Sequence, residues 1–379
     1  MKKNLFLVAL AAMSLASCSN DEVMEIKQDA ISFDIVANNG SRAVDIYSNS
    51  NKPTSFQVTA IHTDAEGVES IYIDDETVTL KNGAYEFADN QKRYWPATGS
   101  LTFYAVVEPV NYTEWVGLGA FYDASYTKSV AVDAEDSKYK YQITIGQPGN
   151  STVDVAARGT AEEHHDLLYA VAAGKTKSVD GESPVMLNFR HAFSQIVFNA
   201  KHTSNSISVN VNKITLRNIN SGMDFTLPAT STDLSTTPNV SPTGLWPAGV
   251  GVSGFPTKYT LSVEPAEDDK KVVISAEKTE HNLTYGKTAL LLPAQNIAMG
   301  DVLAPSGGFV LMVDCEIYNV VGDAKVAIFE GVKNIPMAIN WEAGKKYIYT
   351  LDFDGDDDIT FNLTVEPFVD VESDVTVKY

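Results

Sequence analysis

Cysteine, histidine and positive charge are all scarce in this sequence of 379 residues. Its 2 cysteines are too few for a disulfide framework or a cysteine-based metal site. Lys and Arg number 28 against 49 Asp and Glu, which gives a formal charge of -21 and leaves no basic stripe. Because nucleic-acid binding depends on the neutralisation of phosphates, this charge argues against any nucleic-acid partner. Beyond the N-terminal segment, no run is long and apolar enough to span a membrane.

Familiar catalytic and ligand-binding motifs are missing as well. The chain has no His-Glu-x-x-His, no Gly-x-Ser-x-Gly and no glycine-rich phosphate loop. The run His164-His165-Asp166 has no third metal ligand at a suitable local spacing. The Asp-rich segment 352–358 does not match a calcium loop, which needs glycine at its sixth position and glutamate at its twelfth, so a turn between strands is the better interpretation. We therefore expect no enzyme activity, no catalytic residue, no metal and no cofactor.

The N-terminal segment predicts export and lipidation. Lys2 and Lys3 precede an apolar run, and small residues follow up to Cys18, which is the pattern of a secretory signal over residues 1–17. A cysteine directly after the expected cut is the arrangement of a bacterial lipoprotein, in which the Cys18 sulfur carries diacylglycerol as an anchor. Residues 19–22 form a short acidic tether, which is common in lipoproteins on the outer face of the outer membrane. The predicted location is therefore the outer membrane and cell surface.

A short alternating segment follows the tether. Ile31, Phe33 and Ile35 are apolar with polar residues between them, which predicts a half-buried strand. A turn-rich stretch then leads to Arg42 and Ala43. An exposed, flexible arginine is a site at which a trypsin-like protease cuts, so cleavage after Arg42 would separate residues 18–42 from the rest of the chain.

The remainder of the sequence predicts an all-β protein. Short alternating runs such as 101–107, 137–145 and 347–353 are bounded by turn residues, and no window longer than about three turns has helical periodicity. Many short strands of this kind are typical of β-sandwiches. A polar stretch with Gly181 and Pro184 suggests a boundary. We expect an N-terminal sandwich over 43–182 and a C-terminal sandwich over 183–379.

The C-terminal tail, 359–379, alternates over nearly its whole length. Its apolar positions are Ile359, Phe361, Leu363, Val365, Val369, Val371, Val375 and Val377. At about 3.3 Å per residue this tail is far longer than a usual strand. It forms either two strands broken at Pro367, or one strand within the fold and one that leaves it. A chain end that is apolar on one face can add to the sheet edge of another subunit.

An aromatic loop offers an alternative function. Tyr112, Trp115 and Tyr122 lie between two predicted strands and could stack on sugar rings. The better interpretation is that these residues cover the end of a sandwich or form a contact between subunits. An anchored surface lipoprotein that binds host or bacterial glycans or proteins is therefore the second hypothesis.

Several landmarks in order along the chain resemble the Bacteroidales fimbrillins, the subunits of surface pili. They are Cys18, the strand Ile31-Ser32-Phe33, the site Ser41-Arg42-Ala43, Tyr94-Trp95-Pro96 with the run 101–105, Asp166-Leu167-Leu168-Tyr169-Ala170, and the segments 187–196 and 286–295. Their order and spacing cover nearly the whole chain.

The resemblance implies two transthyretin-like β-sandwich domains and a route of assembly. A lipidated precursor reaches the cell surface, and an arginine-specific protease cuts after the first strand, here after Arg42. The released strand, here Ile31, Phe33 and Ile35, leaves a groove that the C-terminal strand of another fimbrial subunit fills. The donor would come from the tail, 359–379.

Overall fold

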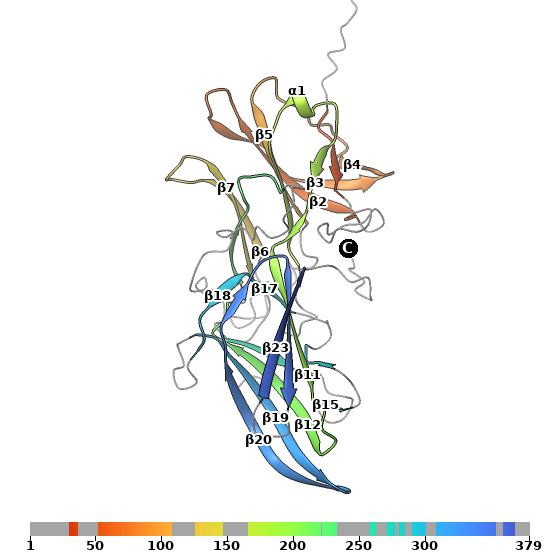
Figure 1. Ribbon diagram of the computed structural model, residues 1–379. Helices are drawn as coiled ribbons and strands as arrows, with labels where there is room; N and C mark the ends of the chain where they lie inside the picture. The colour runs from red at the N-terminus through yellow and green to blue at the C-terminus, as the bar shows by residue number, and fades with distance from the viewer. Residues whose placement is uncertain are drawn as a thin grey trace, which may run out of the picture.

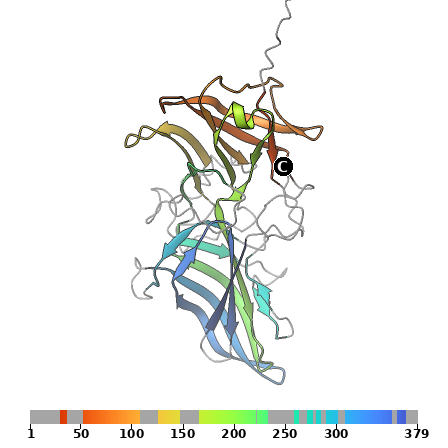
Figure 2. The same cartoon turned by 45° about the horizontal axis from the view of Figure 1, so that its top comes forward.

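The protein is nearly all β. The structure is a computed structural model that describes residues 30–36, 52–107, 126–146, 166–220, 222–232, 258–262, 271–276, 280–284, 290–300, 308–353 and 359–367. The strands form two stacked lobes in an elongated molecule (Figures 1 and 2). Among the described residues, the helix α1 (Lys177–Asp180) is too short to cross a membrane, and no other helix qualifies. The predicted all-β fold is thereby confirmed.

The first lobe is built on an 8-stranded sheet with the order β10-β8-β5-β2-β3-β4-β1-β9. In that order its strands are Arg190–His191, Leu168–Lys175, Ser100–Val107, Ser55–Thr63, Glu69–Lys81, Ala84–Phe87, Phe33–Ile35 and Val185–Leu187. One apolar core draws residues from strands throughout this sheet, β1 and β9 included, so the sheet closes around it.

A 3-stranded sheet, β13-β7-β6, covers the other face of the large sheet. Its strands are Gly222–Thr226, Tyr139–Gly146 and Tyr126–Val132. Ile143 and Ile145 pack there with Tyr104 and Val106 in a second core. Polar contacts fasten the edge of this sheet to β3, since Lys128 pairs with Asp75 at 2.6 Å.

The second lobe is a sandwich of two 5-stranded sheets over one core. The first sheet holds β16 (His281–Asn282), β11 (Phe193–Lys201), β22 (Lys345–Phe353), β23 (Ile359–Pro367) and β17 (Leu290–Pro293). The second holds β14 (Lys258–Ser262), β12 (Ile207–Arg217), β19 (Val310–Val321), β20 (Ala324–Pro336) and β15 (Val272–Ile274). The short pair β18 (Gln295–Ile297) and β21 (Ile339–Trp341) completes it.

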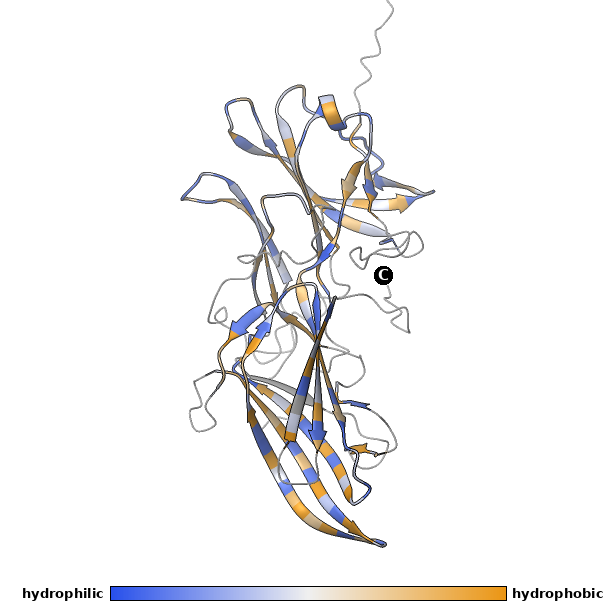
Figure 3. Cartoon of the chain, in the orientation of Figure 1, coloured by the Kyte–Doolittle hydropathy of each residue, from blue (hydrophilic) through white to orange (hydrophobic). Residues whose placement is uncertain are grey.

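Alternation explains these strands. The long strands of the second lobe change between hydrophobic and hydrophilic residues along their length (Figure 3). In β19, for example, Val313, Cys315 and Ile317 are buried while the residues between them are half-buried. Period-two patterning places one set of side chains in the core and the other toward solvent.

The chain passes between the lobes more than once. β10 ends at His191 in the first lobe and β11 begins at Phe193 in the second, so only Ala192 separates them. β13, which follows β12 of the second lobe, returns to pair with β7. The sheets therefore change near Ala192, whereas β9 and β10 lie beyond the expected boundary at 182 and still pair in the first lobe. The division of the chain into domains stays a proposal.

Candidate functional site

Strand β1 is an inner strand of the first lobe. It pairs antiparallel with β4, where Phe33 lies opposite Tyr85, and parallel with β9, where Phe33 lies opposite Val185. Flanking backbone groups extend this pairing: Ile31 N donates to Arg93 O at 2.7 Å and Val36 N donates to Leu187 O at 2.9 Å. β1 therefore supplies backbone partners to the strands on both sides.

The side chains of β1 reach the middle of the core. Ile31, Phe33 and Ile35 are 5%, 4% and 1% exposed. The Phe33 ring contacts three other rings edge-on, those of Phe56, Phe87 and Phe103, with centroids 5.8, 6.0 and 5.4 Å away. Edge-to-face packing of this kind adds to the burial of apolar surface. The sequence predicted a half-buried strand, and the structure places its apolar face in a fully enclosed core.

Polar contacts hold the outer face of β1. The Asp34 carboxylate accepts a hydrogen bond from Lys52 Nζ at 2.7 Å. The Tyr85 hydroxyl donates to Pro53 O at 2.7 Å, and burial, with a smaller contribution from Asp34, raises the pKa of this phenol. The segment that follows Asn51 is thus tied to the strand that lies beside β1.

Strand β23 occupies a different position, at the edge of its sheet. Among the strands that the structure describes, it pairs only with β22, from Lys345 opposite Pro367 to Phe353 opposite Ile359. Ile359 packs against the core of the second lobe, but Leu363 and Val365 are 48% and 50% exposed. The last described residue of β23 is Pro367, which has no N–H to donate to a strand ladder.

Several predicted site residues lie outside the described residues. They are Cys18, Arg42, Ala43, Tyr112, Trp115, Tyr122, Val369, Val371, Val375 and Val377. Lipidation, cleavage, glycan contact and the second half of the tail therefore stay predictions.

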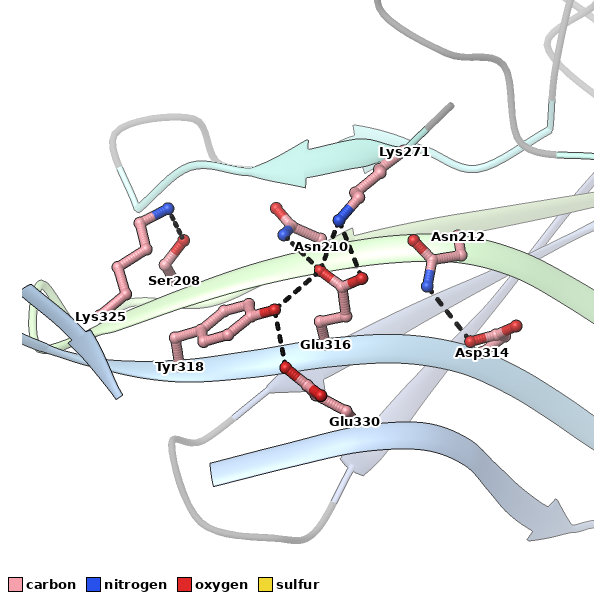
Figure 4. Close-up of polar contacts among 9 residues, drawn as sticks. All are labelled: Ser208, Asn210, Asn212, Lys271, Asp314, Glu316, Tyr318, Lys325 and Glu330. Atoms are coloured by element: carbon pink, nitrogen blue, oxygen red, sulfur yellow. Dashed lines mark hydrogen bonds and ion pairs between the residues drawn. The ribbon is translucent and has the colours of Figure 1, made fainter. Parts of the chain in front are cut away.

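Sequence reasoning missed a polar network on the outer face of the second lobe (Figure 4). Glu316 accepts hydrogen bonds from Lys271 Nζ at 2.7 Å and from Asn210 Nδ2 at 3.0 Å. These contacts, that of Lys271 first, lower the pKa of Glu316. The Tyr318 hydroxyl lies 3.1 Å from Glu316 and 3.0 Å from Glu330, and the latter contact is the main cause that raises the pKa of Tyr318 to about 12.

A second missed pair joins Asp166 to His191. The Asp166 carboxylate contacts His191 Nδ1 at the point where the chain leaves the first lobe. The sequence showed no third metal ligand at a local spacing from Asp166 and did not indicate its contact with His191. In the part of the chain that the structure describes, no group of three or more His, Cys, Asp or Glu is placed to hold a metal.

A solved structure shares this fold. A fimbrial protein from Bacteroides vulgatus superposes with a TM-score of 0.63 at 16% identity, over 90% of this chain and 99% of that chain. A putative cell adhesion protein from Bacteroides ovatus gives a TM-score of 0.44 at 15% identity, over 91% and 99%. The tip fimbrial protein Mfa3 from Porphyromonas gingivalis gives 0.31 at 11% identity, over 89% and 99%. No curated protein matches the chain.

The family assignment rests on the sequence as a whole. The model of the fimbrillin-like family matches residues 41–367, which is most of the chain. This chain therefore belongs to the fimbrillin-like family.

Proposed function

We propose that this chain is a structural subunit of cell-surface fimbriae, exported as a lipoprotein precursor and polymerised by strand donation. Membership of the fimbrillin-like family supports the fimbrial role and the cell-surface location. The proposed sequence of events is lipidation at Cys18, transfer to the outer membrane, cleavage after Arg42 by an arginine-specific protease, and entry of another fimbrial subunit's tail into the emptied site. The role is structural, and no catalytic step is proposed.

The observation that carries this proposal is the position of β1. Its removal would leave β4 and β9 without a strand between them, and Phe56, Phe87 and Phe103 without the ring that they surround. Bare apolar surface and unpaired backbone groups are both costly in water. A second strand of similar alternation would restore both at once. Binding of a donor strand is therefore coupled to the removal of β1.

We extend the proposal to the domain organisation. Two transthyretin-like sandwiches, first assigned to 43–182 and 183–379, fit a chain of two lobes in which the second lobe is a sandwich of two sheets. We propose that the chain passes from the first unit to the second near Ala192, which is supported by the pairing of β10 with β8 and of β11 with β22.

The N-terminus of the protein on the cell surface tests this function. Mass spectrometry of material sheared from cells should find Ala43 as the first residue of chains in high-mass assemblies. A lipidated Cys18 on all of the surface protein would contradict polymerisation after cleavage. That result would instead favour an anchored lipoprotein that binds glycans through Tyr112, Trp115 and Tyr122.

A further inference from the structure

Two short segments toward opposite ends of the chain have chemically similar sequences, with identical residues at two of five positions. Residues 31–35 read Ile-Ser-Phe-Asp-Ile and residues 359–363 read Ile-Thr-Phe-Asn-Leu. At each of the five positions the two segments agree in chemistry: branched aliphatic, hydroxyl, phenylalanine, side-chain carbonyl and branched aliphatic. The first segment contains β1 and the second begins β23.

This inference rests on the proposed strand donation and specifies its partner. We propose that the strand that replaces β1 comes from a second copy of this chain, and that it enters in a single register. Phe361 takes the place of Phe33, with Ile359 and Leu363 in the places of Ile31 and Ile35. The chain is then complementary to itself and needs no other subunit type to polymerise.

The shape of the Phe33 site selects this register. Three rings surround Phe33, so a smaller side chain at that point would leave a cavity. The later apolar positions of the tail, at 369, 371, 375 and 377, are all valine. Phe368 has Glu366 and Asp370 two residues to either side, which would put two carboxylates where the site holds Ile31 and Ile35. Within the tail, Phe361 alone is a phenylalanine flanked by aliphatic residues at both of these positions.

The polar positions also match. Asp34 lies on the outer face and accepts a hydrogen bond from Lys52 Nζ at 2.7 Å. Asn362 offers a carbonyl oxygen to the same donor. The backbone bonds of the site, such as Val185 N to Ser32 O at 2.8 Å, do not depend on the side chain and are open to any strand that runs in the direction of β1. The donated segment therefore runs antiparallel to β4 and parallel to β9.

The position of β23 in its own sheet favours its transfer to the β1 site of another molecule. Within the described part of the chain, β23 is an edge strand with one neighbour, β22, whereas β1 has two. Leu363 is 48% exposed on β23, while the corresponding Ile35 is 1% exposed. Transfer to the β1 site would bury this side chain and pair both edges of the strand.

Cysteine cross-linking tests the register. In the β1–β9 pair Asp34 lies opposite Met186, whose side chain is 49% exposed, so Asn362 of the donor should lie opposite Met186 of the acceptor. Directly opposed residues fall in the range of about 4.4–6.8 Å between Cα atoms that a disulfide requires. We would prepare Met186→Cys and Asn362→Cys separately in a full chain that also carries Cys18→Ser, cleave both after Arg42, mix them and oxidise.

We expect at least about tenfold more linked dimer from this mixture than from the matched mixture with Thr364→Cys, which lies roughly 7 Å further along the strand. Polymers in which Thr364→Cys links better would overturn the register but leave strand donation standing. Absence of polymers in every mixture would overturn strand donation itself. An internal disulfide in a monomeric double variant, Met186→Cys with Asn362→Cys, would overturn the second copy as the partner.

Polymer yield gives an independent measurement. Phe361→Ala should reduce the yield at least about tenfold, whereas the truncation Val321→Ala, at a position that is 61% exposed and outside both segments, should leave it unchanged. The urea midpoint of each uncleaved chain shows whether the variant is folded before cleavage. Loss of polymers in a third variant, Val371→Ala, but not in a folded Phe361→Ala would assign donation to the later part of the tail and overturn the register.

Discussion

Strands β1 and β23 show how one sequence pattern behaves in two places. In the segments that contain them, an aliphatic residue, a hydroxyl residue, phenylalanine, a residue with a carboxylate or amide, and a second aliphatic residue follow one another. Even so, Ile35 is 1% exposed and Leu363 is 48% exposed. The difference comes from their neighbours: β1 lies between β4 and β9 under a closed core, and β23 lies at the edge of its sheet. Burial on a strand is therefore set by the strands around it as much as by its own alternation.

Deletion of residues 30–36 should have the largest effect on stability. It removes Ile31, Phe33 and Ile35 from the core, a loss of roughly 5–9 kcal/mol at about 1.5–3 kcal/mol for each buried side chain. Urea unfolding followed by fluorescence should show the first lobe unfolding at a lower concentration. A peptide of residues 30–36 should raise that midpoint again in proportion to the logarithm of its concentration. An unchanged midpoint would show that β1 contributes nothing to the fold.

The single substitution Phe33→Ala should cost about 3–5 kcal/mol, because it leaves a cavity among three rings. Leu363→Ala in β23 is the matched control and should cost about 1 kcal/mol or less, since the side chain is already half exposed. Both values come from urea midpoints of the uncleaved chain. Equal costs would contradict the contrast between the inner and the edge strand.

Glu316→Gln probes the polar network on the outer face of the second lobe. The ion pair with Lys271 lowers the pKa of Glu316, so its stabilisation is present at neutral pH and is lost as the pH falls through the lowered value. The variant should lose about 1 kcal/mol at neutral pH and should match the parent in acid. Paired denaturation curves at the two pH values measure this. A difference that persists in acid would indicate a packing effect instead.

Tyr85 reports the state of the β1 site through its ionisation. Its folded pKa is raised, so folding favours the neutral phenol; this stability is complete below the ordinary value of about 10 and is lost as the pH rises above it. In a chain that lacks residues 30–36, an absorbance titration should show one more tyrosine that ionises at about pH 10. The extra step should disappear in the same chain with Tyr85→Phe. Identical titrations with and without β1 would show that the strand does not cover Tyr85.

Asp34→Asn makes β1 more like β23 and should have the smallest effect. Asp34 is partly exposed, and its ion pair with Lys52 is worth about 0.2–1 kcal/mol. The variant should lose this contribution at low salt and equal the parent at about 1 M salt, where charges are screened. Stability curves at both salt concentrations provide the check. A loss that salt does not reduce would mean that the carboxylate serves the backbone of Ile35, to which it also lies close.

Much of the strand content could be read from the sequence. Alternation predicted the strands that became β5, β7 and β22, because one face of each packs against a core. Alternation does not predict the bulge between Val211 and Lys213 within β12. It did not identify β20, whose edge position leaves Val326, Ile328 and Val332 exposed and so weakens the pattern.

The site was predictable only in part. The apolar residues of β1 and their burial follow from the pattern at 31–35. The neighbours of β1 do not, because β9 lies about 150 residues away and its parallel pairing is set by long-range packing. The same reason hides the contact of Asp166 with His191, which brings together residues 25 positions apart.

The return of β13 to the first lobe has a mechanical consequence. The chain passes from β10 to β11 with one residue between them, comes back to place β13 beside β7, and is again in the second lobe at β14. A joint crossed three times resists twist and bending far more than a single linker does. Separation of the lobes would also have to break the pairing of β13 with β7, so this pairing should stiffen the joint between them.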